Sequence, residues 1–193
     1  MTMLTDAKTL IGSPVDASGN YDGLLEDIIA GILAEADEFM GVAHQKVEDQ
    51  VDWFDGGERV LYLSHVNAST PVVEVDEVVL TSDEFTLYPE AGRIRYGGSG
   101  LTGVVTASGG RGGRFPAGYR NVKVTYDGGY DEKDYPKSLL RKLLKQVSYE
   151  FRRRNDPGLS AVTFPDGSVQ KFTIGEWLPD VEAELLRRRR ICL

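Results

Sequence analysis

The sequence is poor in the residues that build disulfides and metal sites. Its one cysteine, Cys192, stands next to the last residue, so no disulfide can form within the chain. Its two histidines, His44 and His65, have no cysteine or second histidine at the spacing of a metal site. We therefore expect no metal and no cofactor, and we interpret both histidines as surface or partly buried polar residues.

Long apolar runs are also missing. No stretch approaches the roughly 20 apolar residues that a membrane-spanning helix needs. The N-terminal segment MTMLTDAKTLIGSP lacks the continuous apolar core of a signal peptide. We expect a protein that is made in the cytoplasm and stays there, or is packaged into something assembled there, with no membrane partner.

Motifs for enzymatic chemistry are absent. There is no Gly-x-Ser-x-Gly elbow, and Ser64 and His65 are neighbours whose side chains would point apart on a strand. The glycines of residues 109–114 are not followed by the Lys-Ser/Thr of a phosphate loop, and residues 127–134 lack the ligand spacing of a calcium loop. Carboxylates are numerous, but most lie on an exposed helix face or in turns. The sequence therefore predicts no enzyme.

Acidic and basic residues are distributed unevenly along the 193 residues. The net charge is −8, yet residues 1–100 hold 19 acidic and 5 basic residues, whereas residues 101–193 hold 11 and 17. The two parts thus carry −14 and +6. Such a division suits head-to-tail contacts between copies, or a basic surface against an acidic partner. Two solvated faces of a monomer would explain it equally well.

Apolar spacing predicts helices in the first forty residues. A short helix is expected over Leu4–Ile11, ended by Gly12. The next apolar positions recur at helical spacing from Leu24 to Met40, with acidic residues between them. Asp22 is placed to cap this amphipathic helix and Gly41 to end it.

The pattern changes to β structure over residues 51–130. Short β-branched and aromatic runs alternate with glycine-rich breaks. We expect strands at Val60–Leu63, Val72–Leu80, Phe85–Tyr88, Arg93–Tyr96, Leu101–Ala107 and Val122–Tyr126, with a turn at Tyr88–Gly92. The region is interpreted as an antiparallel β-subdomain.

Helical spacing returns within residues 131–160, after Pro136. Its buried stripe would be Leu139, Leu140, Leu143, Leu144, Val147 and Phe151. At 100° per residue, Arg141, Lys145 and Arg152 fall on the opposite face and form a basic side. A hairpin turn is expected at Pro165–Ser168, and Pro179 opens a last helix. The fold class predicted is α+β: a helical bundle of long N-terminal and C-terminal-half helices with an inserted antiparallel β-subdomain.

The C-terminal segment has the most unusual local composition. Four consecutive arginines, Arg187–Arg190, are followed by Ile191 and Leu193 and preceded by Trp177. Cations are favoured at a helix C-terminus, which would suffice for a solvated end. Arginine combined with apolar and aromatic anchors is the composition of an interface, and we favour that interpretation.

In this order, the segments resemble the head–tail connector family of tailed bacteriophages, also called adaptor or head-completion proteins. The resemblance rests on LLEDIIAGILAEADEFMG, FTLYPEAGRIRY, NVKVTYDGGY and PKSLLRKLLKQVSYEFRRRNDPG, followed by the basic tail. The order and spacing of these segments carry it, above all VKVTYDGGY before a proline and a leucine-rich helix. The glycine- and arginine-rich segment 97–118 has no counterpart in the family pattern. We expect it to order against a neighbouring subunit.

The resemblance implies a single connector domain over residues 1–193, repeated as a ring, usually of twelve copies, in the virion neck. Such a ring joins the portal protein to a stopper or tail-completion protein and extends the channel through which DNA passes without specific recognition. Residues 171–193 would dock on the portal, with Trp177, Arg187–Arg190, Ile191 and Leu193 as the contacts. Glu35, Asp37 and Glu38 are candidates for the channel surface. Arg141, Lys145 and Arg152 are candidates for a basic face between subunits.

Three alternatives remain open from the sequence. The chain could be another neck component, such as a stopper or tail-completion protein, although those tend to be dominated by a β-barrel. It could bind DNA through the basic residues of the two C-terminal helices, in which case its affinity would fall steeply with salt. An enzyme with a carboxylate site would need a polar cleft with perturbed acids.

Overall fold

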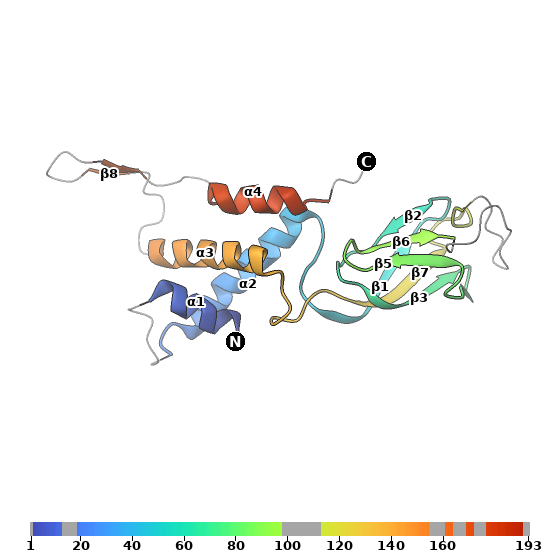
Figure 1. Cartoon of the computed structure of the whole chain (residues 1–193), viewed down its shortest axis with the longest axis horizontal. Helices are drawn as coiled ribbons and strands as arrows, with labels where there is room; N and C mark the ends of the chain where they lie inside the picture. The colour runs from blue at the N-terminus through green and yellow to red at the C-terminus, as the bar shows by residue number, and fades with distance from the viewer. Residues whose placement is uncertain are drawn as a thin grey trace. The chain divides into compact units, whose positions relative to one another are not determined.

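The structure is a computed structural model that describes residues 2–12, 19–97, 113–154, 161–163, 169–171 and 177–190. It is a mixed α+β fold in which the chain forms two compact units (Figure 1). Residues 1–41 and 132–193 belong to unit 1, and residues 42–131 belong to unit 2. The chain therefore leaves unit 1 after its second helix and returns to it before the third.

Unit 1 contains helices that pack on one another. They are α1 (Met3–Ile11), α2 (Asp22–Met40), α3 (Lys137–Arg153) and α4 (Pro179–Arg188). Helix α3 contacts each of the other three and lies between α1 and α4 (Figure 1). Its buried side includes Leu139, Leu143, Leu144, Val147 and Phe151, five of the six positions predicted for its apolar stripe. Burial of these large side chains is the main force that holds the unit together.

Of the two predictions for the ends of α2, the one for its C-terminus is correct and the one for its N-terminus is wrong. Gly41 closes the helix in the left-handed conformation, with φ +68°, as predicted. Asp22 does not cap it: the N-cap residue is Tyr21, which makes no side-chain capping bond. The Asp22 carboxylate instead forms an ion pair with Lys8 of α1. Because both partners are partly exposed, this ion pair contributes little stability.

A two-stranded antiparallel ladder precedes α4. Strand β8 (Ala161–Thr163) pairs with β9 (Val169–Lys171), and Val162 lies opposite Gln170. This is the hairpin expected around Pro165–Ser168, although the turn itself lies outside the described residues.

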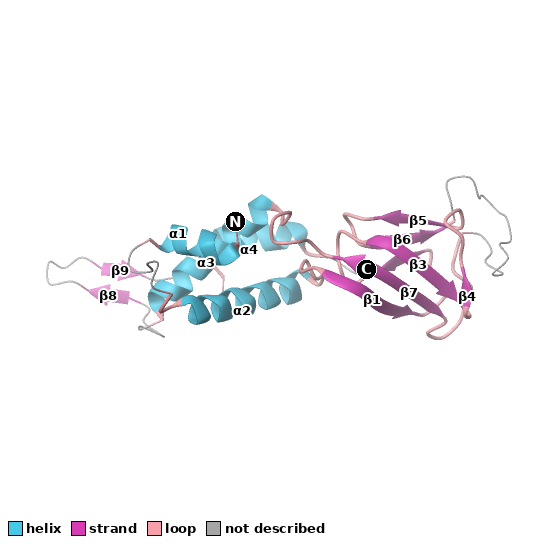
Figure 2. Ribbon diagram, turned by 90° about the horizontal axis from the view of Figure 1, so that it is seen from below, coloured by secondary structure: helices cyan, strands magenta, loops and turns pink. Residues whose placement is uncertain are grey.

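Unit 2 is built from two antiparallel sheets (Figure 2). The first sheet has the order β1 (Val47–Phe54), β7 (Val122–Gly128), β3 (Ser69–Val75), β4 (Val78–Val79). The second has the order β2 (Val60–Tyr62), β6 (Arg93–Tyr96), β5 (Phe85–Tyr88). Alternate residues of both sheets, such as Val124 and Ile94, enter one shared core. The outer faces of the two sheets therefore point in opposite directions.

Two strands differ from the prediction. Strand β1 was missed, because acidic residues interrupt its apolar positions, and the β region begins at Val47 instead of 51. The run Val72–Leu80 is not one strand: Asp76 and Glu77 adopt φ +49° and +67° and turn the chain from β3 into β4. The strand expected at Leu101–Ala107 lies outside the described residues. The turn predicted at Tyr88–Gly92 is confirmed by the pairing of β5 with β6.

The Asp127–Gly129 segment at the end of β7 has a steric reason for its glycines. A Cβ on Gly128 would lie 2.6 Å from the Cβ of His65. Gly129 has φ +82°, and a Cβ there would lie 2.0 Å from the carbonyl oxygen of Gln45. Since no side chain fits, these glycines let the end of β7 pass close to the first segment of the unit.

Candidate interaction surfaces

Helix α4 is fixed to α3 along one side only. Val181 and Leu185 are fully buried, whereas Leu186 is 51% exposed. The N–H of Leu178 donates to the Oε1 of Gln146, a side chain of α3 that is itself buried, at 3.0 Å. This bond satisfies a backbone group at the start of α4 that the helix cannot satisfy itself. The helix thus presents a side with Leu186 to solvent.

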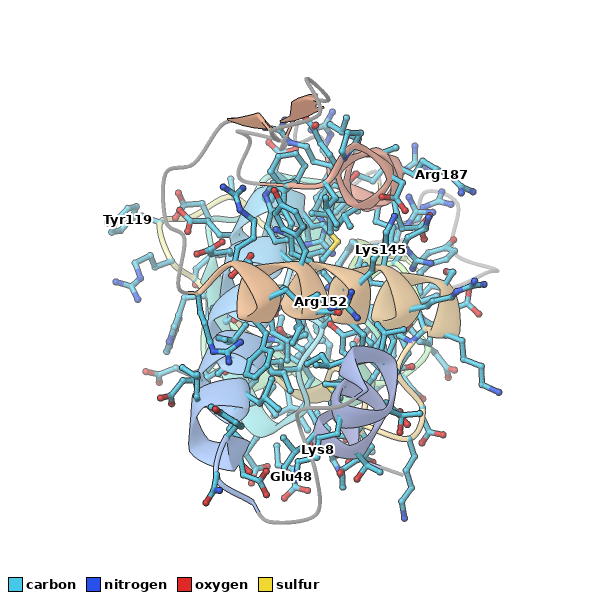
Figure 3. The ribbon with its side chains drawn as sticks, turned by 90° about the vertical axis from the view of Figure 1, so that its left-hand side faces the viewer. Lys8, Glu48, Tyr119, Lys145, Arg152 and Arg187 are labelled. Carbon is cyan, nitrogen blue, oxygen red and sulfur yellow. The ribbon has the colours of Figure 1, made fainter. Side chains whose placement is uncertain are left out.

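The four arginines predicted as portal contacts do not share one helix. Helix α4 ends at Arg188, and the next residue has the extended ψ of 127°. Arg187 and Arg188 both bind Glu184, at 3.2 and 2.9 Å, and Arg188 also donates to Ser138. Arg187 keeps a side chain that is 79% exposed and projects from the outer side of α4 (Figure 3). Of the pair, Arg187 is therefore the better placed to meet a partner.

The last described residues run along the end of α2. The Arg189 guanidinium lies 5.7 Å from the ring centre of Phe39, and the N–H of Arg190 donates to the carbonyl of Met40 at 2.8 Å. That carbonyl is one of the four at a helix C-terminus without a partner inside the helix. Helix α2 therefore fixes the position of the chain at Arg189 and Arg190, directly after α4. Ile191 and Leu193, the predicted apolar anchors, lie outside the described residues.

Trp177 has a role inside unit 1. Its side chain is 8% exposed and packs edge-on against Phe39, with ring centres 6.4 Å apart. The two aromatic rings line a shallow hollow together with Glu35 and Glu38. The ring therefore helps to hold the start of α4 on α2, and only its edge is accessible.

The basic side predicted on α3 is partly occupied by contacts within the unit (Figure 3). Lys145 and Lys142 both bind Asp180 of α4, at 2.8–2.9 Å, and their hydrogen bonds lower the pKa of Asp180 to about 2. Arg152 donates to the carbonyl of Ile11 at 3.2 Å and so caps the end of α1. Arg141 is exposed, and no ion pair involves it among the residues that the structure describes.

The acidic side of α2 is open to solvent. Glu35 and Glu38 are exposed, and Asp37 is half-buried. Helix α2 contains six acidic residues and no lysine or arginine. Burial raises the pKa of Glu150 on the neighbouring helix, and the charge of Glu35 adds to this effect. The solvent-facing side of α2 therefore carries negative charge without positive charge from the same helix.

A polar cluster in unit 2 contains Asp52, Ser64 and His65, which are the residue types of a catalytic triad. The Asp52 carboxylate accepts hydrogen bonds from the Ser64 hydroxyl and backbone N–H and from the Tyr126 hydroxyl, at 2.7–2.8 Å. The Ser64 hydroxyl thus binds Asp52 directly, whereas a triad serine needs a histidine as its base. None of the three hollows next to Arg59, Trp53 and Trp177 is lined by these residues. The cluster joins β1, β7 and the segment after β2.

Neither a metal site nor a membrane helix emerges from the described ranges. Within them, no three histidine, cysteine or acidic side chains gather as metal ligands would. No helix there is long and apolar enough to cross a bilayer.

Comparison with known proteins finds solved structures that share the fold along almost the whole chain. No protein-family model matches the sequence, and no curated protein matches it either. Among solved structures, a chain from the neck of an empty gene transfer agent (GTA) particle, computed with C6 symmetry, superposes with a TM-score of 0.60. The match covers 98% of this chain and 90% of that one, at 14% identity. The fold is that of a particle-neck chain.

Two further GTA structures give the same result. A chain of the native GTA virion matches with a TM-score of 0.55 and 15% identity, over 98% of this chain and 90% of that one. A chain of the native GTA neck, computed with C12 symmetry, matches with a TM-score of 0.53 and 14% identity, over 98% and 89%. At these identities the likeness concerns the fold.

The sequence interpretation missed an exposed apolar face in this neck-type fold. Val51 and Trp53 of β1, Val72 of β3 and Val79 of β4 are 40–59% exposed. The register of the strands brings them to the outer side of the first sheet, around the Lys123–Glu74 ion pair. Nearby, Tyr119 is 84% exposed and projects from the surface (Figure 3). The alternation in Val51–Asp52–Trp53 indicated a strand with an apolar side. Without the partner strands, it could not show whether that side of the sheet is buried or exposed.

Proposed function

We propose that the chain is a non-enzymatic structural subunit of a virion neck, repeated as a ring between the portal and the stopper or tail. The observation that supports this most is the match to GTA neck chains along almost the full length of both chains. Those necks were computed with C6 and C12 symmetry, which is the symmetry of rings. The proposed ring has twelve copies and extends the channel for DNA.

A ring needs a subunit with two different surfaces, because each copy contacts the next through a heterologous interface. Unit 2 offers two unlike outer faces, and unit 1 offers the acidic side of α2. Some of the lysines and arginines of α3 and α4 that could have bound DNA are engaged within unit 1: Lys145 binds Asp180, and Arg188 binds Glu184. This supports passage of DNA without specific recognition over direct DNA binding.

The C-terminal segment is the proposed portal anchor. It begins at the exposed Leu186 and Arg187, follows the end of α2, and continues into Ile191 and Leu193. Leu186 and Arg187 are exposed enough for a partner to bury a large part of their side-chain surface. Trp177 supports the anchor from inside unit 1.

The test is co-sedimentation with the portal ring from the same genome. We compare the wild type with a deletion of residues 191–193 and with Leu186→Ala/Arg187→Ala. These changes spare Arg188, which donates to Ser138 of α3, and the backbone N–H of Arg190, which donates to Met40 of α2. Lys137→Ala, at another exposed position, is the matched control.

We expect the wild type and the control to bind near one copy per portal subunit, and both anchor variants to lose at least about tenfold in affinity, the equivalent of 1.4 kcal/mol. Undiminished binding by both variants would keep the neck role and refute the anchor. If even the wild type failed to bind the portal but bound the stopper ring, the chain would be another neck component. Binding to neither ring, with salt-sensitive affinity for DNA, would replace the proposal by the DNA-binding alternative.

A further inference from the structure

Three arginines gather on the outer face of the second sheet of unit 2. Arg93 and Arg95 alternate with the buried Ile94 and Tyr96 on β6, so their side chains share the outer side. Register places Tyr88 of β5 opposite Arg93 and Val60 of β2 opposite Arg95. Arg59 joins them around one shallow hollow. We call Arg59, Arg93 and Arg95 with Val60 and Tyr88 the arginine face.

The arginine face lacks compensating carboxylates. Across the described ranges, no ion pair involves Arg59, Arg93 or Arg95, whereas Lys123 and Lys46 of the same unit pair with Glu74 and Asp131. Arg93 stacks over the Tyr88 ring at 4.6 Å, and its buried Nε has no hydrogen-bond partner. Residues 42–131 hold 13 acidic and 8 basic residues, so this positive face stands out in an acidic unit. These three guanidinium groups without an ion pair, one of them held over the Tyr88 ring, are prepared to receive an anion.

The composition of the face favours carboxylates of a protein over the phosphates of a nucleic acid. Arginine and tyrosine around a small apolar centre is the composition of energetic centres in protein interfaces. Strong binding to nucleic acids uses more phosphate contacts, typically six to ten. Three arginines in a unit with an excess of acidic residues would hold DNA weakly. The arginine planes can, however, bind a carboxylate through two parallel hydrogen bonds.

The chain itself carries the complementary surface. Helix α2 has six acidic residues and no basic one. Its Glu26, Asp27, Glu35 and Glu38 are exposed, and none of the four forms an ion pair within the described part of the chain. Such a helix surface of one sign matches an arginine surface of the opposite sign.

We propose that the arginine face of one copy binds the acidic outer side of α2 in a second copy. The two surfaces are different, so the contact is heterologous and can continue from copy to copy until a ring closes. This inference rests on the proposed ring and names the contact that builds it. It assigns Glu35 and Glu38 to the junction between copies, in place of the channel lining that the sequence had suggested.

A charge swap tests the contact from both sides. Arg93→Glu/Arg95→Glu reverses the arginine face, Glu35→Lys/Glu38→Lys reverses α2, and a fourfold variant carries both changes. Lys133→Glu/Lys137→Glu, at exposed positions outside both surfaces, is the control with the same change in net charge as the first variant. Self-association is measured by sedimentation velocity of the full-length chain, free and bound to the portal ring, with thermal melting to establish that each variant is folded.

We expect each single-side reversal to weaken association between copies on the order of tenfold to a hundredfold. The fourfold variant should recover most of that loss, and the control should behave as the wild type. Because the two reversals lie in different units, a folding defect in one leaves the other as an independent test. Association unaffected by either reversal, or a loss in both that the fourfold variant does not recover, would overturn the proposal.

The proposed function and this contact fail in different ways. A wild type that binds no neck ring refutes the neck role whatever the variants do. A wild type that binds the portal, with arginine-face variants that still assemble side by side, refutes only the contact. If the arginine-face reversal leaves assembly intact but abolishes binding to fluorescent duplex DNA at low salt, the face serves nucleic acid instead.

Discussion

Asp52 shows at the scale of one residue how unit 2 tolerates a buried charge. Burial alone would raise the pKa of this carboxyl. Hydrogen bonds from the Ser64 backbone and hydroxyl, from Gln50 and from Tyr126 outweigh it and hold the pKa below the ordinary value of 3.8. Burial and the bond to Asp52 raise the pKa of the Tyr126 hydroxyl in turn. The pair is therefore an ionised acceptor and a neutral donor across the neutral range.

This network makes stability depend on pH. A group whose pKa is lowered by folding contributes stability that is present above its unfolded pKa and is lost as pH falls through the folded value. Asp52→Asn removes the charge and places amide hydrogens opposite donors, so we expect a loss of about 1.5–3 kcal/mol in the free energy of unfolding at pH 7. The difference from the wild type should shrink below pH 3.8, where the unfolded carboxyl becomes protonated.

Chemical denaturation between pH 2.5 and 8 measures both effects. Tyr126→Phe should also destabilise the chain, because Asp52 and the N–H of His65 lose a partner. Tyr119→Phe, at an exposed ring, should change stability by less than about 0.5 kcal/mol. A difference between Asp52→Asn and the wild type that stays constant over the whole range would contradict the role given to the charge.

At the scale of elements, α4 is attached through one side. Leu185 and Leu186 are adjacent leucines, but the first is fully buried and the second is 51% exposed. Leu185→Ala should therefore lower the free energy of unfolding of unit 1 by about 2–5 kcal/mol through lost burial and a cavity. Leu186→Ala should cost less than about 0.5 kcal/mol. Denaturation followed by the fluorescence of Trp177, in a Trp53→Phe background so that only unit 1 is observed, compares them, and equal losses would contradict this orientation of α4.

The same element shows what the sequence could predict. The 3.6-residue spacing identified α2 and α3, because one covered side leaves its period in the chain, and Pro179 marked the start of α4. Spacing could not separate Leu185 from Leu186, since both fall near the edge of the apolar stripe and only the position of α3 decides between them. The burial of Gln146 could not be predicted from the sequence, because its partner is a backbone N–H 32 positions away.

Strands were harder to predict for a related reason. Strand β1 has three acidic residues among its eight, and its membership in a sheet depends on pairing with β7, whose partner residues lie 68 to 81 positions further along the chain. The arginine face could not be recognised either. Arg93 and Arg95 were visible as alternating positions, but Arg59, Val60 and Tyr88 join them only through the pairing of β6 with β2 and β5. Whether a predicted portal contact is buried, ion-paired or exposed depends on where α2 and Glu184 lie, and only the structure places these.

At the scale of the whole molecule, the chain has two cores. Leu139 belongs to the core of unit 1 and Leu63 to that of unit 2, and both side chains are fully buried. The chain passes between the units twice, near residues 41 and 131. Units with separate cores usually unfold as separate cooperative transitions, so a single free energy of unfolding would not describe this protein.

Matched substitutions distinguish the two cores. Leu139→Ala and Leu63→Ala remove the same atoms from each, at an expected cost of about 2–5 kcal/mol. For units of this size, that loss lowers the midpoint of one transition by about 10 °C or more and leaves the other unchanged. Differential scanning calorimetry gives the midpoints, and hydrogen exchange assigns each transition to its unit. If both substitutions moved one common transition equally, the two units would unfold as one, and the loss of a core leucine in either would then weaken every surface of the ring subunit together.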